Sequence, residues 1–425
     1  MLQAMYNGVS AIQATQEDMD ILGNNIANVD TTAYKGSDAT FADELSQLIQ
    51  GGSAGNGSTG GTNPIQTGTG VRISSISTVV SQGSLLSTSS PTDMAIQGNG
   101  YFVLASASSG MTYTRDGHFA LDNSGRLVDA STGAYVLGWT ASGTGKLNST
   151  AQITAASSIQ IPIGNQAAVQ ATQNISLGGN LSADDAAGDT YTTNETVYDS
   201  LGQAHTVDVT FTREKEAKTG NGSNVWSWTA TPSPATDKSL APPAGTTNMG
   251  TVTFNGNGQL SASTGGLLLN PTGGATAGQQ IALNFGSMSQ VSGASTVSPT
   301  SQDGFPPGSL QSFNVDQNGV ITGVYSNGLI RPLGQIAIAG FTNPQGLNAA
   351  GDNQYTPSPN SGSANIGPAN TLGLGSIATG YLEQSNVDLG TQLSNMVVVQ
   401  NAFEANTKIV TAVDQMLSTL IQMKQ

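Results

Sequence analysis

The 425-residue sequence predicts a mainly β fold with one α-helix at each end, and three observations support this prediction. Apolar residues near both ends recur at steps of three and four, the spacing of one face of a helix. The residues between the ends form short runs rich in β-branched and aromatic side chains, bounded by turn-forming residues. Finally, 54 residues are Gly and only 9% are charged, which suits short strands and tight turns.

The first helix is expected from about Leu2 to Asn28. Gly8 and Gly23 each destabilise it by about 1 kcal/mol relative to Ala, so we expect the helix to be marginal on its own. Its apolar stripe comprises Met5, Val9, Ile12, Met19, Leu22 and Ile26.

The second helix is expected from Asn386 to Lys424, a length of about 58 Å at 1.5 Å per residue. Ser385 followed by Asp388 matches a capping box at its start. Because two narrow stripes cannot form a core alone, we predict that they pair with each other or with neighbouring copies of the chain, and we interpret both as self-assembly residues. The second stripe comprises Leu389, Leu393, Met396, Phe403, Val410, Val413, Leu417 and Leu420.

Between the helices, the sequence predicts an arm followed by strands. The segment from Gly51 to Gly70 has no apolar periodicity, and we interpret it as a linker or an arm that orders only on a partner. Strands are expected in the runs 71–80, 101–104, 207–211 and 225–228.

One turn pattern recurs four times in the middle of the chain, at Asp122, Asp199, Asn255 and Asp316. In each copy the Asp or Asn is followed by two residues and then Gly, which predicts a β-hairpin with Gly in the left-handed conformation. A calcium loop is the alternative for such segments. Calcium needs six to eight oxygen ligands, usually with a distal carboxylate, and none stands at a suitable distance after Asp122 or Asp316. We therefore predict no metal site.

Charge and cysteine content exclude several classes of function. The sequence has 12 Lys plus Arg against 27 Asp plus Glu, a formal net charge of -15, so we expect neither nucleic acid nor a membrane as partner. Without Cys there is no disulfide and no thiol chemistry. No Lys or Arg precedes Lys35 and no long apolar run follows, so neither a cleaved signal peptide nor a membrane span is expected.

The sequence offers little catalytic chemistry. Its two histidines, His118 and His205, lie in strand-like segments without a nucleophile motif beside them. The stretch 97–102 has two glycines of a phosphate-binding loop but lacks the third Gly, the Lys and the following helix, so we interpret it as a turn. We expect no enzymatic activity and no cofactor.

Short sequence motifs with conspicuous Asn, Thr, aromatic and Gly residues occur at both ends and in the middle of the chain. The segment after the first helix contains Asn28, Thr31, Tyr34 and Lys35, and the second helix contains Asn406 within the run 396–408. Between them lie three shorter motifs, at 97–102, 113–117 and 125–128. Together these motifs resemble the signatures of the axial proteins of the bacterial flagellum, the family of the rod and the hook. We add Asn28, Thr31, Tyr34, Lys35 and Asn406 to the predicted self-assembly residues on this resemblance.

The chain departs from the family pattern at three positions. Ala33 stands where Gly is usual, Asn401 where Arg is common, and Gln392 where an acidic residue is frequent. The last two changes remove charges that could pair neighbouring copies. They leave the apolar stripes unchanged.

The resemblance implies a domain order. The terminal helices form a coiled-coil-like inner tube, followed outward by an inner β-domain and an outer β-domain inserted into it; residues 148–308 look like the outer domain of the hook members of the family. The implied boundaries are 1–35 and 380–425 for the inner tube, 36–75 for a linker arm, 76–147 and 309–379 for the inner β-domain, and 148–308 for the outer β-domain.

By the same resemblance, the chain is expected to polymerise into a curved, flexible tube that joins the rod to the filament around a central export channel. The implied partners are many copies of itself, the distal rod protein, the hook cap protein, the hook-filament junction protein and the flagellar export apparatus. The implied location is the extracellular flagellum, reached without a cleaved signal peptide.

Several alternatives stay open at this stage. Within the family, the chain could be a distal rod or junction protein. In another class, it could be a secreted β-rich, adhesin-like binding protein whose helices trimerise. Gln16 and Gln400 stand where an apolar residue is due, and they either fix the register between helices or face the channel.

Overall fold

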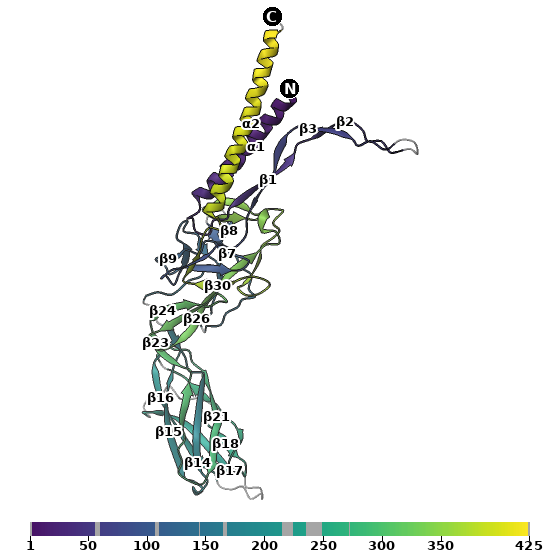
Figure 1. Cartoon of the computed structure of the whole chain (residues 1–425). Coiled ribbons are helices and arrows are strands. Elements are labelled where there is room, and N and C mark those ends of the chain that lie inside the picture. The colour runs from purple at the N-terminus through teal and green to yellow at the C-terminus, as the bar shows by residue number, and fades with distance from the viewer. Residues whose placement is uncertain are drawn as a thin grey trace.

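The computed structural model describes residues 2–55, 60–106, 110–143, 145–164, 168–214, 224–234, 249–271 and 273–423. Over these residues the chain is elongated, with the two helices at one end and two β-domains stacked below them (Figure 1). An arm projects sideways from the base of the helices. The predicted fold class, mainly β with a helix at each end, is confirmed.

The two helices form an antiparallel pair. Helix α1 spans Leu2–Ala27 and helix α2 spans Leu389–Met423. Near the start of α1, a Cβ added at Gly8 would lie 3.0 Å from Val410 Cγ2, so this glycine lets the helices approach closely. Near its end, Asn25 Nδ2 donates to Gln392 Oε1 at 3.4 Å. In this register the last turns of α2 extend past the start of α1 (Figure 1).

The start of α2 differs from the prediction. Asp388, not Ser385, caps the helix, because its Oδ1 accepts the Thr391 N–H at 2.6 Å. The hydrogen bonds that this carboxylate accepts from the backbone and the side chain of Thr391 lower the pKa of the exposed Asp388 carboxyl. Ser385 Oγ instead accepts the N–H of Val387 at 3.3 Å, before the helix begins. The predicted end at Lys424 lies outside the described residues.

The arm is a long two-stranded hairpin rather than a structureless linker. Strand β1 (Ser37–Asp43) pairs with β4 (Val71–Thr78), and farther out β2 (Ser46–Gln50) pairs with β3 (Ile65–Gly68). The interpretation of residues 51–70 as a linker, or as an arm that orders only on a partner, did not include strand β3, which forms within the single chain; residues 56–59 lie outside the described residues. Periodicity could not reveal this pair because every residue of β2 and β3 is exposed.

The inner β-domain is built around a 12-stranded sheet whose main path runs β24-β25-β26-β7-β11-β10-β9. The strands of the domain that precede the outer domain in the chain are β5 (Leu85–Ser87), β6 (Met94–Gln97), β7 (Tyr101–Ser106), β8 (Gly110–Thr114), β9 (Phe119–Leu121), β10 (Leu127–Asp129), β11 (Tyr135–Val136) and β12 (Gly138–Thr140). Of these, β5 and β6 pair outside the large sheet, with β31 and β30. The elements that follow the outer domain are β24 (Leu310–Val315), β25 (Val320–Tyr325), β26 (Ile330–Gly340), the short helix η1 (Pro344–Gly346), β27 (Asn348–Gly351), β28 (Gln354–Thr356), β29 (Asn365–Pro368), β30 (Ser376–Thr379) and β31 (Tyr381–Glu383).

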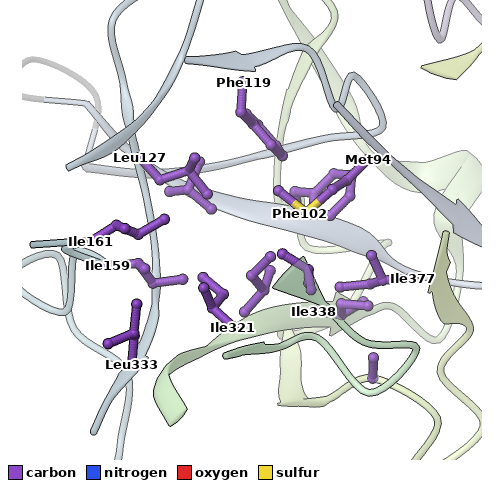
Figure 2. Packing of buried hydrophobic residues seen from close by; sticks show 14 of the residues in the cluster. Met94, Phe102, Phe119, Leu127, Ile159, Ile161, Ile321, Leu333, Ile338 and Ile377 are labelled. Carbon is purple, nitrogen blue, oxygen red and sulfur yellow. The ribbon is translucent and has the colours of Figure 1, made fainter. Parts of the chain in front are cut away.

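The core of this domain draws on segments far apart in the chain (Figure 2). Phe102 packs edge-on against Phe119 with ring centroids 5.0 Å apart, and Ile338 of β26 belongs to the same cluster. Ile159 and Ile161 are also part of it. The inner β-domain therefore continues beyond residue 147, and the outer domain does not start at residue 148 as predicted.

The outer β-domain is a sandwich of two sheets, ordered β20-β21-β14-β22 and β15-β16-β17-β18-β19. Trp226, Trp228 and Phe211 fill its core. Strands β13 (Ala168–Gln170) and β23 (Phe305–Gly308) pair with each other and join it to the inner domain. The sandwich strands are β14 (Asn174–Ser182), β15 (Thr190–Tyr198), β16 (Ala204–Arg213), β17 (Asn224–Ser233), β18 (Met249–Phe254), β19 (Leu260–Ser263), β20 (Leu267–Leu269), β21 (Gln279–Val291) and β22 (Ser298–Gln302).

All four predicted hairpin turns are confirmed. At each one the side-chain oxygen of the Asp or Asn accepts two backbone N–H groups, for example Asp122 Oδ1 from Ser124 at 2.8 Å and from Arg126 at 2.7 Å. The same pattern caps the turns at Asp199, Asn255 and Asp316. Each turn glycine has positive φ; their values are 74° at Gly125, 82° at Gly202, 75° at Gly258 and 76° at Gly319.

Replacing Gly125 by Ala is expected to destabilise the inner β-domain. The left-handed backbone alone costs about 1–2 kcal/mol with a side chain, and the added Cβ would lie 2.2 Å from the Ile161 carbonyl oxygen. Gly133→Ala, at φ 71° with open space around it, should show only the conformational part. Gly143→Ala, with open space and no positive φ, should be neutral. Chemical denaturation of the three variants measures the ranking, and equal stabilities would contradict it.

Candidate assembly surface and its anchor

The two predicted apolar stripes pack against each other within the chain, but only in part. Leu22 and Val413 are buried, at 5% and 4% exposure. Val9, at 38%, is exposed on α1. The partly buried members are Met5, Ile12, Met19, Ile26, Met396, Phe403, Val410 and Leu417, and the exposed members on α2 are Leu389, Leu393 and Leu420. Asn406, which was added on the resemblance, is also partly buried. The pair therefore buries one narrow seam and leaves apolar surface uncovered.

A second apolar row on α2 was not identified from the sequence, and we call it the outer seam. Its apolar residues recur at steps of four and three up to Met416, after which Thr419 interrupts the row before Met423, and all but the half-buried Ala402 are exposed: Val398, Ala402, Ala405, Ile409, Ala412, Met416 and Met423. Val398 is 66% exposed and Met423 80%. A heptad count that included alanine would have found this row, because its small residues stand at the same spacing as its large ones.

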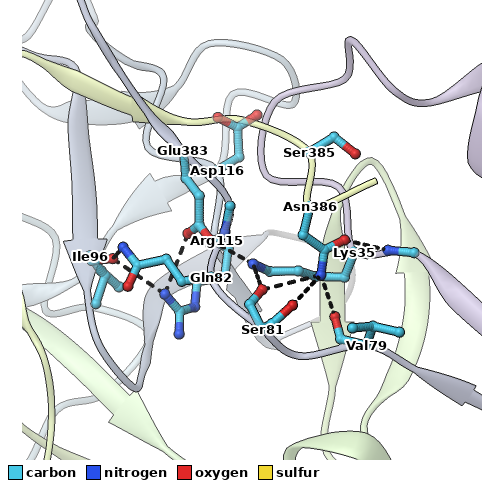
Figure 3. A network of polar contacts seen from close by, with 12 residues as sticks. Lys35, Val79, Ser81, Gln82, Ile96, Arg115, Asp116, Glu383, Ser385 and Asn386 are labelled. Atoms are coloured by element: carbon cyan, nitrogen blue, oxygen red, sulfur yellow. Dashed lines mark hydrogen bonds and ion pairs between the residues drawn. The ribbon is translucent and has the colours of Figure 1, made fainter. Parts of the chain in front are cut away.

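Below the helices, a buried ion cluster joins three separate segments of the chain (Figure 3). The Glu383 carboxylate has no exposed side-chain surface, and its two oxygens lie 2.5 Å from Lys35 Nζ and 3.4 Å from Arg115 Nη1. Gly83 N–H donates to the same carboxylate at 2.9 Å. Two cations thus share one carboxylate. Both cations also donate to backbone carbonyls, Lys35 to Ser81 and Arg115 to Gly98.

The burial of Lys35 assigns it a different place from the predicted one. Its side chain is 2% exposed, so it is not available to contact another copy. Burial lowers the pKa of Lys35, and the Arg115 charge acts in the same direction, while the hydrogen bond and charge of Glu383 oppose both. We therefore reassign Lys35 from the self-assembly residues to the junction between the helical pair and the inner β-domain.

Two asparagines hold the backbone around this cluster. Asn25, 1% exposed, donates to the Ser37 carbonyl at 2.8 Å and accepts the Ser37 N–H at 3.0 Å. Asn386 accepts the Gly36 N–H at 2.9 Å and donates to the Val79 carbonyl at 2.7 Å (Figure 3). The C-terminal end of α1 and the segment just before α2 are thus hydrogen-bonded to the base of the arm.

The other predicted junction residues make contacts within the turn after α1. Asn28 donates to the Asn24 carbonyl at 3.0 Å, and Thr31 Oγ1 donates to Asn28 Oδ1 at 3.1 Å. The Tyr34 hydroxyl donates to Asn25 Oδ1 at 3.3 Å. In this chain Asn28, Thr31 and Tyr34 shape the turn that leads from α1 into the cluster, and their part in self-assembly stays a prediction.

The departure from the family pattern at Ala33 has a structural counterpart. Ala33 is fully buried and has φ 59°, the left-handed region in which glycine is favoured. Its N–H donates to the Glu383 carbonyl oxygen at 2.8 Å. The turn therefore requires this conformation, because it brings the backbone that follows α1 into hydrogen-bonding contact with β31.

The histidines have structural partners. His205 and Asp199 are buried together, with Nε2 and Oδ2 3.3 Å apart, while Oδ1 of the same aspartate caps its turn. His118 Nδ1 lies 3.0 Å from Asp93 Oδ1 at the surface. Among the described residues, His, Asp and Glu nowhere gather in a group of three or more that could hold a metal ion. None of the described helices has both the length and the hydropathy to cross a membrane.

Family models match both ends of the chain and most of its middle. Four family models match: flagella basal body rod protein at residues 5–35, flagellar hook protein FlgE/F/G D1 domain at 95–183, flagellar basal body protein FlaE D2 domain at 168–305, and flagellar basal body rod FlgEFG protein C-terminal at 378–423. The D2 match begins at β13 and ends at β23, the two strands that join the outer β-domain to the inner one.

Full-length relatives and one solved structure are similar to the chain. The flagellar hook protein FlgE of Treponema pallidum is 38% identical, covering 100% of both chains, and that of Salmonella typhimurium is 32% identical, covering 98% of each. The crystal structure of Helicobacter pylori flagellar hook protein FlgE2 is similar in fold, with a TM-score of 0.50 and 18% identity over 70% of this chain and 100% of that one.

Replacing Glu383 by Gln should loosen the attachment of the helical pair. The substitution keeps the side-chain shape but leaves Lys35 and Arg115 buried without their carboxylate, which costs about 3–5 kcal/mol when one partner of a buried ion pair is removed. Circular dichroism during denaturation should show earlier unfolding. Glu404→Gln, on the exposed side of α2, is the matched control and should change stability by less than about 0.5 kcal/mol. Equal unfolding curves for the two variants would contradict this account of the cluster.

Proposed function

The chain belongs to the flagellar hook protein family, and we propose that it polymerises into the hook through its helical pair and its arm. It is a structural subunit of the flagellar hook, as its full-length relatives are named. Polymerisation with its own copies follows from this membership. The hook of the flagellum is its location.

The distribution of exposed apolar side chains carries the proposal. Of the 26 large apolar side chains that are exposed among the described residues, 12 lie on α1 and α2 and 6 on the arm. The two β-domains, in contrast, have closed cores. Burying apolar surface is worth about 25 cal/mol per Å², so the end of the molecule that carries the helices and the arm gains most from contact with other copies.

The polar outer domain supports a flexible joint. On the solvent face of β15 and β16, threonines stand opposite one another, such as Thr192 and Thr210 with hydroxyls 3.0 Å apart. Such groups exchange contacts with water at little net free energy. We propose that copies stay bonded through their helices and slide past one another at larger radius, so that the tube can bend while it rotates.

The arm is proposed to lie against a neighbouring copy. Leu48, Ile49 and Ile65 are 56%, 65% and 52% exposed on a hairpin that has no core of its own. Where the outer strand pair begins, the arm also contacts α1, because Asn7 Nδ2 donates to the Gly68 carbonyl of β3 at 3.3 Å. The arm and the helical pair therefore move together and present one continuous assembly surface.

The finer partners follow from the family role. We propose that the tube begins on the distal rod protein, grows beneath the hook cap protein and ends at the hook-filament junction protein. We propose further that the flagellar export apparatus delivers each copy through the central channel, without a cleaved signal peptide. A structural role of this kind requires no catalysis.

The purified chain should form tubes under salting-out conditions. Electron microscopy of the product and analytical ultracentrifugation measure this directly. Curved tubes support a hook subunit, straight tubes a rod-like one, and a discrete trimer that never grows would contradict polymerisation. Val413→Asp, which places a charge in the buried seam between α1 and α2, should abolish the tubes because it separates the helices.

Polar replacement of the arm's apolar residues should weaken assembly without affecting the monomer. In the variant Leu48→Ser, Ile49→Ser and Ile65→Ser, we expect thermal unfolding to change by less than about 0.5 kcal/mol because all three side chains are exposed, and tube yield to fall. A control with Gln47→Ser and Gln66→Ser alters the same strands at exposed polar positions. If both variants assemble as the parent chain does, the arm has no part in the contacts.

A further inference from the structure

A cleft of about 390 Å³ in the inner β-domain reaches the Glu383 cluster from the surface, and we call it the Arg115 cleft. Its lining combines buried and exposed side chains from segments far apart in the chain. The buried ones are Tyr101, Arg115 and Leu374, and the exposed ones, at its mouth, include Asn99, Asn365 and Leu372.

The buried part of this cleft holds a cation with an unused hydrogen-bond donor. Arg115 is 5% exposed, and its guanidinium lies over the ring of Tyr101, 5.4 Å from the ring centroid. Its Nη1 donates to the Ile96 carbonyl and to Glu383, both at 3.4 Å (Figure 3). The Nε–H group, in contrast, is buried without an acceptor. Leaving a buried donor unpaired is costly, so this edge of the cluster is incomplete.

The charges of the cluster are also unequal. The Glu383 carboxylate is shared by Lys35 and Arg115, so two cations meet one anion. Of the two cations, Arg115 is the one that lines the cleft. A second negative group in the cleft would therefore balance the charge and accept from the guanidinium.

The mouth of the cleft carries a strained loop with an exposed apolar side chain. Asn370 and Leu372 have φ of 62° and 55°, the left-handed region that leucine rarely adopts. The Leu374 N–H donates to the Thr371 carbonyl at 2.9 Å and closes the turn. Leu374 is buried, whereas Leu372 is 75% exposed. Strained backbone of this kind recurs at loops that hold ligands, and here it keeps a large apolar side chain at the edge of a charged cleft.

We propose that the Arg115 cleft binds a segment of a partner protein that inserts an acidic side chain and places an apolar residue against Leu372. A carboxylate fits because it supplies the missing negative charge and forms charge-assisted hydrogen bonds with a guanidinium. The side-chain amides of Asn99 and Asn365 can donate to and accept from the backbone of the bound segment. This inference goes beyond the proposed function and does not require tubes.

A pair of small peptides tests the cleft in the full-length monomer. The probe is N-acetyl-leucyl-glutamate methylamide, whose side chain carries its single charge, and the control is the uncharged glutamine analogue. We expect the acidic probe to shift the Nε–H resonance of Arg115, assigned by its loss in Arg115→Lys, and to bind about tenfold or more tightly than the control. Equal binding of the two peptides, or an unmoved resonance at the highest probe concentration, would overturn the proposal.

Two exposed asparagines provide a matched pair of variants that leave the ion cluster intact. Asn365→Asp places a negative charge at the mouth of the cleft, and we expect it to weaken binding of the acidic probe by about tenfold. Asn348→Asp, at the start of β27 and outside the cleft, adds the same charge and should bind as the parent chain does. Circular dichroism of both variants controls for folding. Equal affinities in the two variants would contradict a site at this cleft.

The strained leucine distinguishes a binding role from a structural one. Leu372→Gly should not lower the melting temperature, because glycine adopts the left-handed backbone without strain. We expect it to weaken binding of the leucine-containing probe, because the apolar contact is lost. Unchanged affinity would show that Leu372 has no part in the site and would overturn that part of the proposal.

Tubes of the parent chain identify the source of the acidic segment. If a second copy supplies it, the cleft is filled in tubes and the probe no longer binds there. If tubes bind the probe as monomers do, a different protein supplies the segment. A parent chain that forms no tubes would contradict the proposed function alone, because the binding measurements use the monomer.

Discussion

The buried carboxylate of Glu383 is the constraint on which the arrangement of this molecule depends. It holds Lys35 from the segment after α1 and Arg115 from the inner β-domain, and it stands just before α2. The two ends of the chain, nearly 350 positions apart at Lys35 and Glu383, are thereby fixed at one point of the β-domain. Since a carboxylate shared by two buried cations is costly to disturb, the direction in which the helices leave the domain is set by this cluster.

From that anchor outward, the molecule divides into a part that is complete in one copy and a part that is not. The two β-domains bury their aromatic and aliphatic side chains in closed clusters. The helical pair buries one seam, around Leu22 and Val413, and exposes apolar rows on both helices. The anchor presents this incomplete part at a fixed angle. In the proposed function, neighbouring copies cover the apolar rows of the helices while the polar outer domains slide past one another.

Much of the fold was predictable because it is encoded locally. The apolar stripes predicted both helices, and the Asp/Asn-x-x-Gly pattern predicted four hairpins. Both signals depend on residues only a few positions apart in the chain. The Glu383 cluster was not predictable, because it joins residues 35, 115 and 383, whose proximity depends on the whole inner domain. Strand β3 has no inward face to create periodicity. The outer seam was missed because its alanines are not read as apolar signals, although their spacing is regular.

We infer that the helical pair is only partly stabilised within one copy and that neighbouring copies complete its packing. Hydrogen exchange of backbone amides, compared between the monomer and the assembled tube, tests this directly. We expect fast exchange in α1 and α2 of the monomer and strong protection of the same amides in the tube, with β7, β26 and the outer sandwich equally protected in both. Helices as protected in the monomer as the β-domain cores, or protection gained mainly in the outer domain, would contradict it.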